Sequence, residues 1–153
     1  MERIASFTVD HDVLVPGLYL SRRDGNVVTY DLRFKKPNTG DLLTNAEMHS
    51  VEHIIATLLR NSAAKDAVIY FGPMGCRTGF YLLLTGDLTS REVLPLVLET
   101  FRFIRDFQGE VPGASAKDCG NYLDMNLPMA NYWGARYVRL LEGIRDDRLV
   151  YPE

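Results

Sequence analysis

The sequence predicts a single α+β domain over residues 1–153, in which an antiparallel β-sheet and helices packed on one face form two layers. Three observations support this prediction. An alternating, strand-like segment follows a hairpin signal, two capping boxes open long amphipathic segments, and the inferred elements follow in the order β-β-α-β-β-α-α. A chain of this length can bury a core without disulfides or structural metals as staples.

The predicted strands come in two pairs. Apolar residues take every second position from Val28 to Phe34, which is the period of a half-buried strand. An earlier strand over residues 17–22 reaches it through a turn that contains Asp24-Gly25, a dipeptide typical of hairpins. Two further apolar runs, residues 68–71 and 80–85, are short enough to be strands and are joined by a glycine-rich turn.

Three helices account for most of the remaining chain. Thr44 and Glu47 form a capping box, and the helix that begins there carries a core-facing stripe of Met48, Val51, Ile55, Leu58 and Leu59. A second capping box, residues 89–92, opens a helix that runs to about residue 107 and contains Pro95. The last helix is expected from about residue 128 to 145, with apolar positions at Tyr132, Ala135, Val138, Leu141 and Ile144.

Composition excludes several classes of function. The net charge of -3 and the lack of a basic stripe argue against nucleic-acid binding. No apolar run approaches the ~20 residues needed to span a bilayer, so no membrane partner is expected. The N-terminus lacks the pattern of a signal peptide, which predicts a cytoplasmic protein. In that reducing compartment the two cysteines, Cys76 and Cys119, are expected to be free, metal-bound or catalytic.

A metal site is predicted from the segment His49-Ser50-Val51-Glu52-His53. Two histidines four residues apart on a helix stand one above the other and can bind the same metal ion, while Glu52 can act as a base. Catalytic sites usually have three protein ligands and one open position. Cys119 is the leading third ligand and His11 competes with it; Glu92, Glu99 and Glu110 remain alternatives. A His₂Cys set suits Zn²⁺ and could also hold Fe²⁺ or Co²⁺.

Cys76 is the second chemical candidate. It lies in the glycine-rich turn beside Arg77, whose guanidinium can favour the thiolate, so we interpret it as a base or nucleophile. Arg33, Ser6 and His11 could orient a hydroxylated or anionic ligand. Each of these three, taken singly, is more typical of a solvated surface residue.

Five ordered segments together resemble one known family, the S-ribosylhomocysteine lyases of the LuxS type, over nearly the whole chain. They are residues 6–11 (SFTVDH), 31–34 (DLRF, followed by Pro37-Asn38), 49–53 (HSVEH), 73–81 (PMGCRTGFY) and 119–122 (CGNY). The resemblance implies that His49, His53 and Cys119 bind the metal, which is Fe²⁺ in the native family enzyme, with Zn²⁺ or Co²⁺ able to substitute. It also implies that Glu52 and Cys76 are general acid/base groups and that Ser6, His11 and Arg33 hold the substrate.

The resemblance further implies a homodimer with two active sites at the subunit interface, each drawing on both chains. The implied reaction cleaves S-ribosylhomocysteine to homocysteine and 4,5-dihydroxy-2,3-pentanedione, the precursor of autoinducer-2, by carbonyl migration and β-elimination of the thioether. Three positions depart from the commoner family pattern: Met125 replaces a frequent histidine, Lys35 a frequent cysteine and Arg77 a common glutamine. None of these changes removes a group that the reaction needs.

Two other readings compete with the lyase. An inverzincin-like metallopeptidase shares the H-x-x-E-H motif, but its third ligand would be a downstream helical carboxylate and both cysteines would lack a role. A non-enzymatic metal-binding module would have a closed site with four protein ligands, which requires His11 or Cys76 to join the set.

Overall fold

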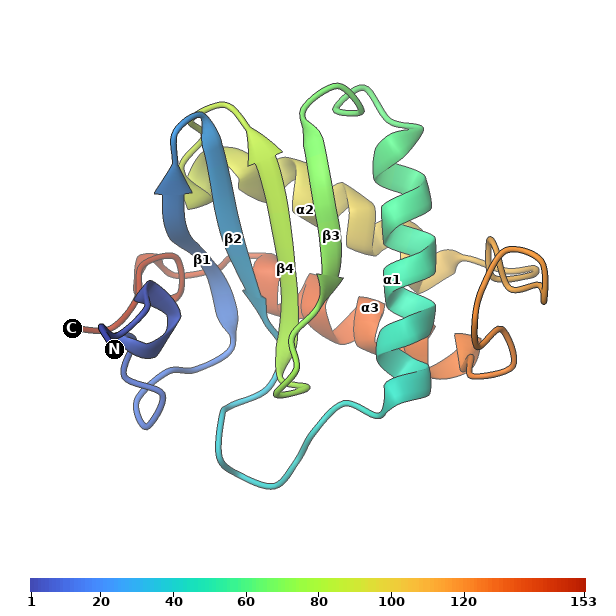
Figure 1. Ribbon diagram of the computed structural model, residues 1–153, viewed down its shortest axis with the longest axis horizontal. Coiled ribbons are helices and arrows are strands. Elements are labelled where there is room, and N and C mark those ends of the chain that lie inside the picture. The colour runs from blue at the N-terminus through green and yellow to red at the C-terminus, as the bar shows by residue number, and fades with distance from the viewer.

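The protein is described by a computed structural model that covers residues 1–153 (Figure 1). A four-stranded antiparallel sheet has the order β1-β2-β4-β3. Its strands are β1 (Gly17–Asp24), β2 (Val27–Arg33), β3 (Val68–Pro73) and β4 (Gly79–Thr85), and the helices are α1 (Asn45–Arg60), α2 (Ser90–Asp106) and α3 (Leu127–Leu141). Two short 3₁₀ helices, η1 (Ala5–Phe7) and η2 (Asp146–Arg148), lie near the chain ends. The predicted class and element order are confirmed.

Both predicted capping boxes begin their helices as expected. In α1 the Thr44 side chain accepts a hydrogen bond from the Glu47 amide, and the Glu47 carboxylate accepts one from the Thr44 amide at 2.8 Å. The same reciprocal pair forms between Thr89 and Glu92 at the start of α2. Each box satisfies amides that have no partner inside the helix, and this fixes where the helices begin.

One hydrophobic core lies between the sheet and the helices. α2 and α3 lie behind the sheet and α1 runs alongside β3 (Figure 1). Phe34, just beyond β2, is central to this core: its ring stacks on Tyr137 of α3 at 4.2 Å and contacts Phe80 and Phe101 at 5.2 and 5.5 Å. Aromatic pairs at these separations add to the stability gained by burying their area.

The face of β2 opposite the core was expected to be exposed to solvent, but its last residues are buried. Asp31 and Arg33 alternate with the core residues, yet they are only 0% and 2% exposed. The C-terminal tail covers this end of the strand, because the Tyr151 hydroxyl donates to the Asp31 carboxylate at 2.8 Å. β2 is therefore buried on both faces where it approaches residue 33.

The prediction for the last helix is partly wrong. Tyr132 is exposed rather than inward, and α3 ends at Leu141 instead of continuing to residue 145. Gly134 explains why the buried face of α3 differs from the predicted one. α3 packs so closely on α2 at this residue that an added Cβ would meet the Arg105 amide nitrogen at 2.9 Å. The helix thus turns its smallest residue toward α2, and its buried residues are Ala130, Trp133, Gly134, Tyr137, Val138 and Leu141.

None of the helices combines the length and apolarity that crossing a membrane requires.

Candidate active site

The predicted metal ligands come together. His49 and His53 lie one turn apart on α1 with their ring centroids 4.6 Å apart, and the Cys119 sulfur lies 3.4 Å from His49 Nε2. One ligand atom from each of the three residues lies within 4.8 Å of the others. His11 and the three alternative glutamates are not part of this group, so Cys119 is confirmed as the neighbour of the two histidines.

Backbone carbonyls orient both imidazoles. His49 Nδ1 lies 2.9 Å from the Asp124 carbonyl oxygen, and His53 Nδ1 lies 2.8 Å from the Pro112 carbonyl oxygen. A carbonyl only accepts, so each Nδ1 carries the proton and donates it, which leaves each Nε2 as the unprotonated nitrogen with a lone pair. Two imidazole nitrogens and one thiol sulfur are the donor types that Zn²⁺ and Fe²⁺ accept, and three protein ligands is the number typical of catalytic sites. The residues therefore fit a metal ion.

Ser50 supports this arrangement from inside the fold. Its buried hydroxyl donates to the Ala46 carbonyl at 2.8 Å and accepts from the Asn126 amide at 2.7 Å, while the Met125 sulfur lies 3.6 Å away. These contacts tie residues 124–126 to α1. The Asp124 carbonyl that orients His49 is thereby held against the helix that carries His49.

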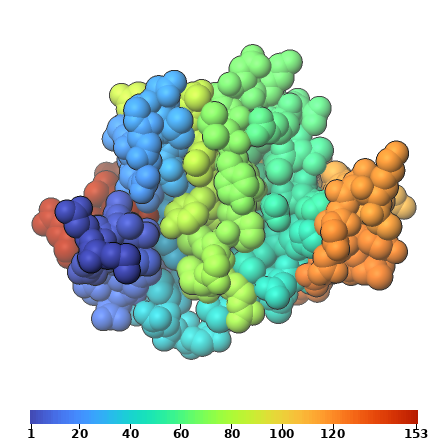
Figure 2. All heavy atoms as spheres, viewed as in Figure 1, coloured from blue at the N-terminus to red at the C-terminus, as the bar shows by residue number.

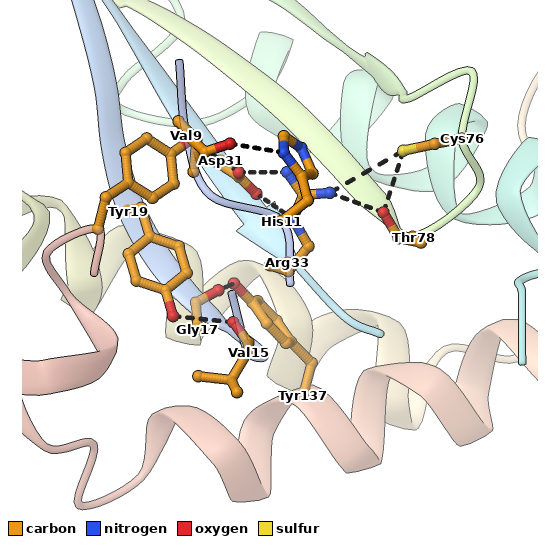
Figure 3. A network of polar contacts seen from close by, with 11 residues as sticks. Val9, His11, Val15, Gly17, Tyr19, Asp31, Arg33, Cys76, Thr78 and Tyr137 are labelled. Carbon is orange, nitrogen blue, oxygen red and sulfur yellow. Dashed lines mark hydrogen bonds and ion pairs between the residues drawn. The ribbon is translucent and has the colours of Figure 1, made fainter. Parts of the chain in front are cut away.

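A second cluster surrounds Cys76 (Figure 3). Arg33 donates through Nη1 to the Thr78 hydroxyl at 2.7 Å and lies 3.9 Å from the Cys76 sulfur, which in turn lies 3.0 Å from that hydroxyl. The expected cation, Arg77, makes no hydrogen bond to Cys76; its backbone φ of 60° turns the chain at this point. Arg33 instead supplies the positive charge, and it reaches Cys76 because β2 and β4 pair in the register Arg33↔Gly79.

Burial controls the charges in this cluster. Burial raises the pKa of Asp31, although the charge of Arg33 and hydrogen bonds from Arg33 and Tyr151 oppose the shift. For Arg33, burial alone would lower the pKa, but the charge and hydrogen bonds of Asp31 outweigh it and the pKa is raised. We therefore describe Asp31 and Arg33 as a buried ion pair, with its two charges in direct contact at 2.5 Å.

The remaining predicted site residues, His11, Ser6 and Glu52, lie in three different places. A pocket of about 580 Å³ is lined by His11, Cys76, Thr78 and four loop residues, Pro37, Asn38, Gly40 and Leu42. His11 Nδ1 lies 2.9 Å from the Val9 carbonyl oxygen, so Nε2 remains available. Ser6 lies half-buried in η1 and Glu52 lies half-buried on α1; neither side chain makes a hydrogen bond within the chain.

The two clusters are separate within one chain. The metal-binding group joins α1 to residue 119, whereas the Arg33–Cys76 cluster joins β2, the β3–β4 turn and the N-terminal segment. The N-terminal segment and the segment around residue 119 lie at opposite ends of the molecule (Figures 1 and 2). The metal-binding group also lacks a fourth protein ligand and a helical carboxylate, which disfavours both the closed module and the peptidase.

Sequence reasoning missed four residues of these networks, namely Asp31, Ser50, Thr78 and Tyr151. Three of them lie inside the segments that carry the family resemblance, so their position was a usable signal. Nothing near residue 151 in the sequence indicates that it contacts residue 31.

Comparisons with known proteins agree with this geometry. A family model described as S-ribosylhomocysteinase (LuxS) matches residues 4–147. S-ribosylhomocysteine lyase of Clostridium acetobutylicum is 58% identical, with 100% of each chain covered. The proteins of the same name from Clostridium beijerinckii and Finegoldia magna are 52% and 50% identical, with 99% and 100% of each chain covered. With the two histidines, the cysteine and the buried arginine in place, the chain belongs to the S-ribosylhomocysteinase (LuxS) family.

Proposed function

We propose that this chain is a carbon–sulfur lyase that cleaves S-ribosylhomocysteine to homocysteine and 4,5-dihydroxy-2,3-pentanedione, the precursor of autoinducer-2. The observation that carries the proposal is the His49–His53–Cys119 group with both histidines oriented by carbonyls, in a chain 58% identical to a lyase of that name.

The metal-binding residues support one part of the chemistry. His49, His53 and Cys119 would hold Fe²⁺, with Zn²⁺ or Co²⁺ as substitutes, and the bound ion supplies Lewis acidity toward a sugar carbonyl. The protein's own contribution is orientation, because the Asp124 and Pro112 carbonyls accept hydrogen bonds that fix both imidazole planes.

Proton transfer falls to Cys76 and Glu52 in this proposal. Removing a proton from C2 of the open-chain ribose and returning one to C1 moves the carbonyl from C1 to C2, and a second round moves it to C3. Loss of the C4 proton then expels the thioether sulfur from C5, and the electron pair leaves with sulfur, which is protonated as homocysteine. No step changes the oxidation state of the protein.

Arg33, His11 and Ser6 are proposed to hold the substrate. His11 and Cys76 line the same surface pocket, and Arg33 contacts Cys76 from beneath it. The amino-acid carboxylate and the hydroxyls of the substrate are suitable partners for these polar groups.

A homodimer would complete the site. In one chain the segment that carries Ser6 and His11 lies at the opposite end from the segment that carries Cys119 (Figure 2). The sheet face opposite the helices also exposes Tyr70 by 50% and Ile69 by 43%, and this apolar area is suited to a second copy. We propose that the Cys76 cluster of one protomer faces the metal-binding group of its partner.

The first experiment measures thiol release. Protein purified anaerobically with Fe²⁺ or Co²⁺ is mixed with S-ribosylhomocysteine, and homocysteine is followed with a thiol reagent. We expect release by the native chain and none by a Cys76→Ala variant that retains its metal. No release from native protein carrying one metal per chain would contradict the lyase assignment.

A complementation experiment tests the shared site. Cys76→Ala and Cys119→Ala chains are co-expressed with different tags, and the mixed dimer is isolated. If each site combines the two clusters across the interface, one of the two sites in the mixed dimer is intact and about half of the native activity returns. An inactive mixed dimer would place both clusters of each site in the same chain.

A further inference from the structure

We propose that Asp31 and Tyr151 are positioning residues for proton transfer, because together they fix the Arg33 guanidinium against Thr78 and Cys76. The inference deepens the proposed function and rests on it. Neither residue contacts the Cys76 sulfur, and both act through Arg33.

Asp31 determines which way the guanidinium faces. Its two carboxylate oxygens accept from Arg33 Nε at 3.1 Å and from Arg33 Nη2 at 2.5 Å. A guanidinium is planar, so fixing the Nε–Nη2 edge also fixes the direction of Nη1. That remaining nitrogen faces the Thr78 hydroxyl and the Cys76 sulfur.

Thr78 transmits this orientation to the sulfur. Arg33 can only donate, so the Thr78 oxygen accepts its hydrogen bond and the single Thr78 proton is free to point toward the Cys76 sulfur 3.0 Å away. A donated hydrogen bond and a nearby cation both stabilise a thiolate. The other titratable groups that face Cys76 are His11 across the pocket and Tyr81 on β4.

Tyr151 completes the set from the C-terminal tail. It donates to Asp31 Oδ2 at 2.8 Å, and its ring stacks on Tyr19 at 4.9 Å. Burial and the charge of Asp31 raise the pKa of Tyr151, so the phenol keeps its proton and remains a donor. The residue lies beyond the segment 4–147 that matches the family model.

The test compares Tyr151→Phe with the native chain, both metal-loaded and without substrate. Phenylalanine retains the ring that stacks on Tyr19 and removes only the hydroxyl. The rate at which iodoacetamide alkylates Cys76 is measured against pH by peptide mass spectrometry, which separates Cys76 from Cys119. Tyr30→Phe is the matched control, since the Tyr30 hydroxyl bonds only the Leu88 carbonyl, at 2.6 Å.

We expect Tyr151→Phe to alkylate about fivefold more slowly at pH 7 and to shift the midpoint of the pH profile upward, because less Cys76 is thiolate. Tyr30→Phe should retain the native profile, and the metal content of both should be unchanged. A native profile for Tyr151→Phe would overturn the proposal. Because no substrate is present, this result is independent of whether the chain releases homocysteine.

Asp31→Asn separates position from charge. If Asp31 only neutralised the charge of Arg33, the Asp31→Asn variant would leave a stronger positive charge beside Cys76, and Cys76 would be alkylated faster. Faster alkylation would overturn the proposal. A positioning role predicts slower alkylation, because the guanidinium is no longer held along one edge. Where Asp31→Asn fails to fold, the Tyr151→Phe comparison decides alone.

Discussion

Replacing Ser50 by alanine should loosen the metal-binding group without touching a ligand. Ser50 is fully buried and lies between His49 and His53 in sequence, yet its hydroxyl accepts a hydrogen bond from the Asn126 amide and contacts neither histidine. Alanine cannot accept from that amide. The segment that places the Asp124 carbonyl on His49 Nδ1 therefore loses one of its attachments to α1.

The magnitude follows from the contacts that are lost. Leaving the Asn126 amide without an acceptor costs about 1–2 kcal/mol of unfolding free energy, the lower part of the range because this amide is only partly buried. Changes next to metal ligands reduce metal affinity by about 10- to 100-fold. Ser50 acts one step further out, through the Asp124 carbonyl, so we expect a loss of about tenfold, or ~1.4 kcal/mol.

Two measurements check this prediction. Chelator competition with Co²⁺, followed by its visible absorption, gives the metal affinity, and urea unfolding of the metal-free protein gives the stability. Thr100→Val is the matched control, because that buried hydroxyl only donates to the Leu96 carbonyl at 2.7 Å and accepts nothing. Native Co²⁺ affinity in Ser50→Ala, with stability lowered as expected, would refute the argument that Ser50 positions the Asp124 carbonyl.

Three further predictions follow from single contacts. Cys119→Ala should lose bound metal, as measured by elemental analysis, whereas Cys76→Ala should retain it; equal retention would contradict the role of Cys119. Gly134→Ala should lower the unfolding free energy by about 1–3 kcal/mol in urea, because the added Cβ meets the Arg105 amide; an unchanged midpoint would show that α2 yields. Burial raises the pKa of Tyr19 from 10.0 to about 12, so the unfolded chain releases this proton first and stability should fall as pH rises between those values. Tyr19→Phe should reduce that slope in urea titrations at successive pH values, and an unaltered slope would count against it.

The sequence alone was sufficient to predict those features that depend on residues close together along the chain. The box of Thr44 and Glu47 involves two residues three positions apart, and it begins α1 where predicted. The helical period was enough to predict that His49 and His53 lie side by side on α1. Cys119 is more distant, yet its chemistry limited the choice of a third ligand and the structure places it beside His49.

Long-range packing explains what the sequence did not reveal. Arg33, taken singly, was expected on the surface. Its burial depends on Asp31 beside it and on Tyr151, and Tyr151 is 120 residues from Asp31 along the chain, so no local pattern indicates the contact. The register of α3 was wrong for a similar reason. The spacing of apolar residues predicted that Tyr132 is buried. Tyr132 is exposed instead, because the face of α3 that packs on α2 is the one that contains Gly134.

The backbone anchors of the two histidines determine how this site tolerates change. Carbonyls of residues 112 and 124 do the orienting, and every residue type has a carbonyl. Side chains at those two positions can therefore be exchanged while the imidazoles keep their planes. The spacing between the anchors and Cys119 has no such freedom, because inserting or deleting one residue would move a carbonyl away from its ring. This segment should accept substitutions and resist changes of length, so a designer can vary its side chains while both imidazoles keep their orientation.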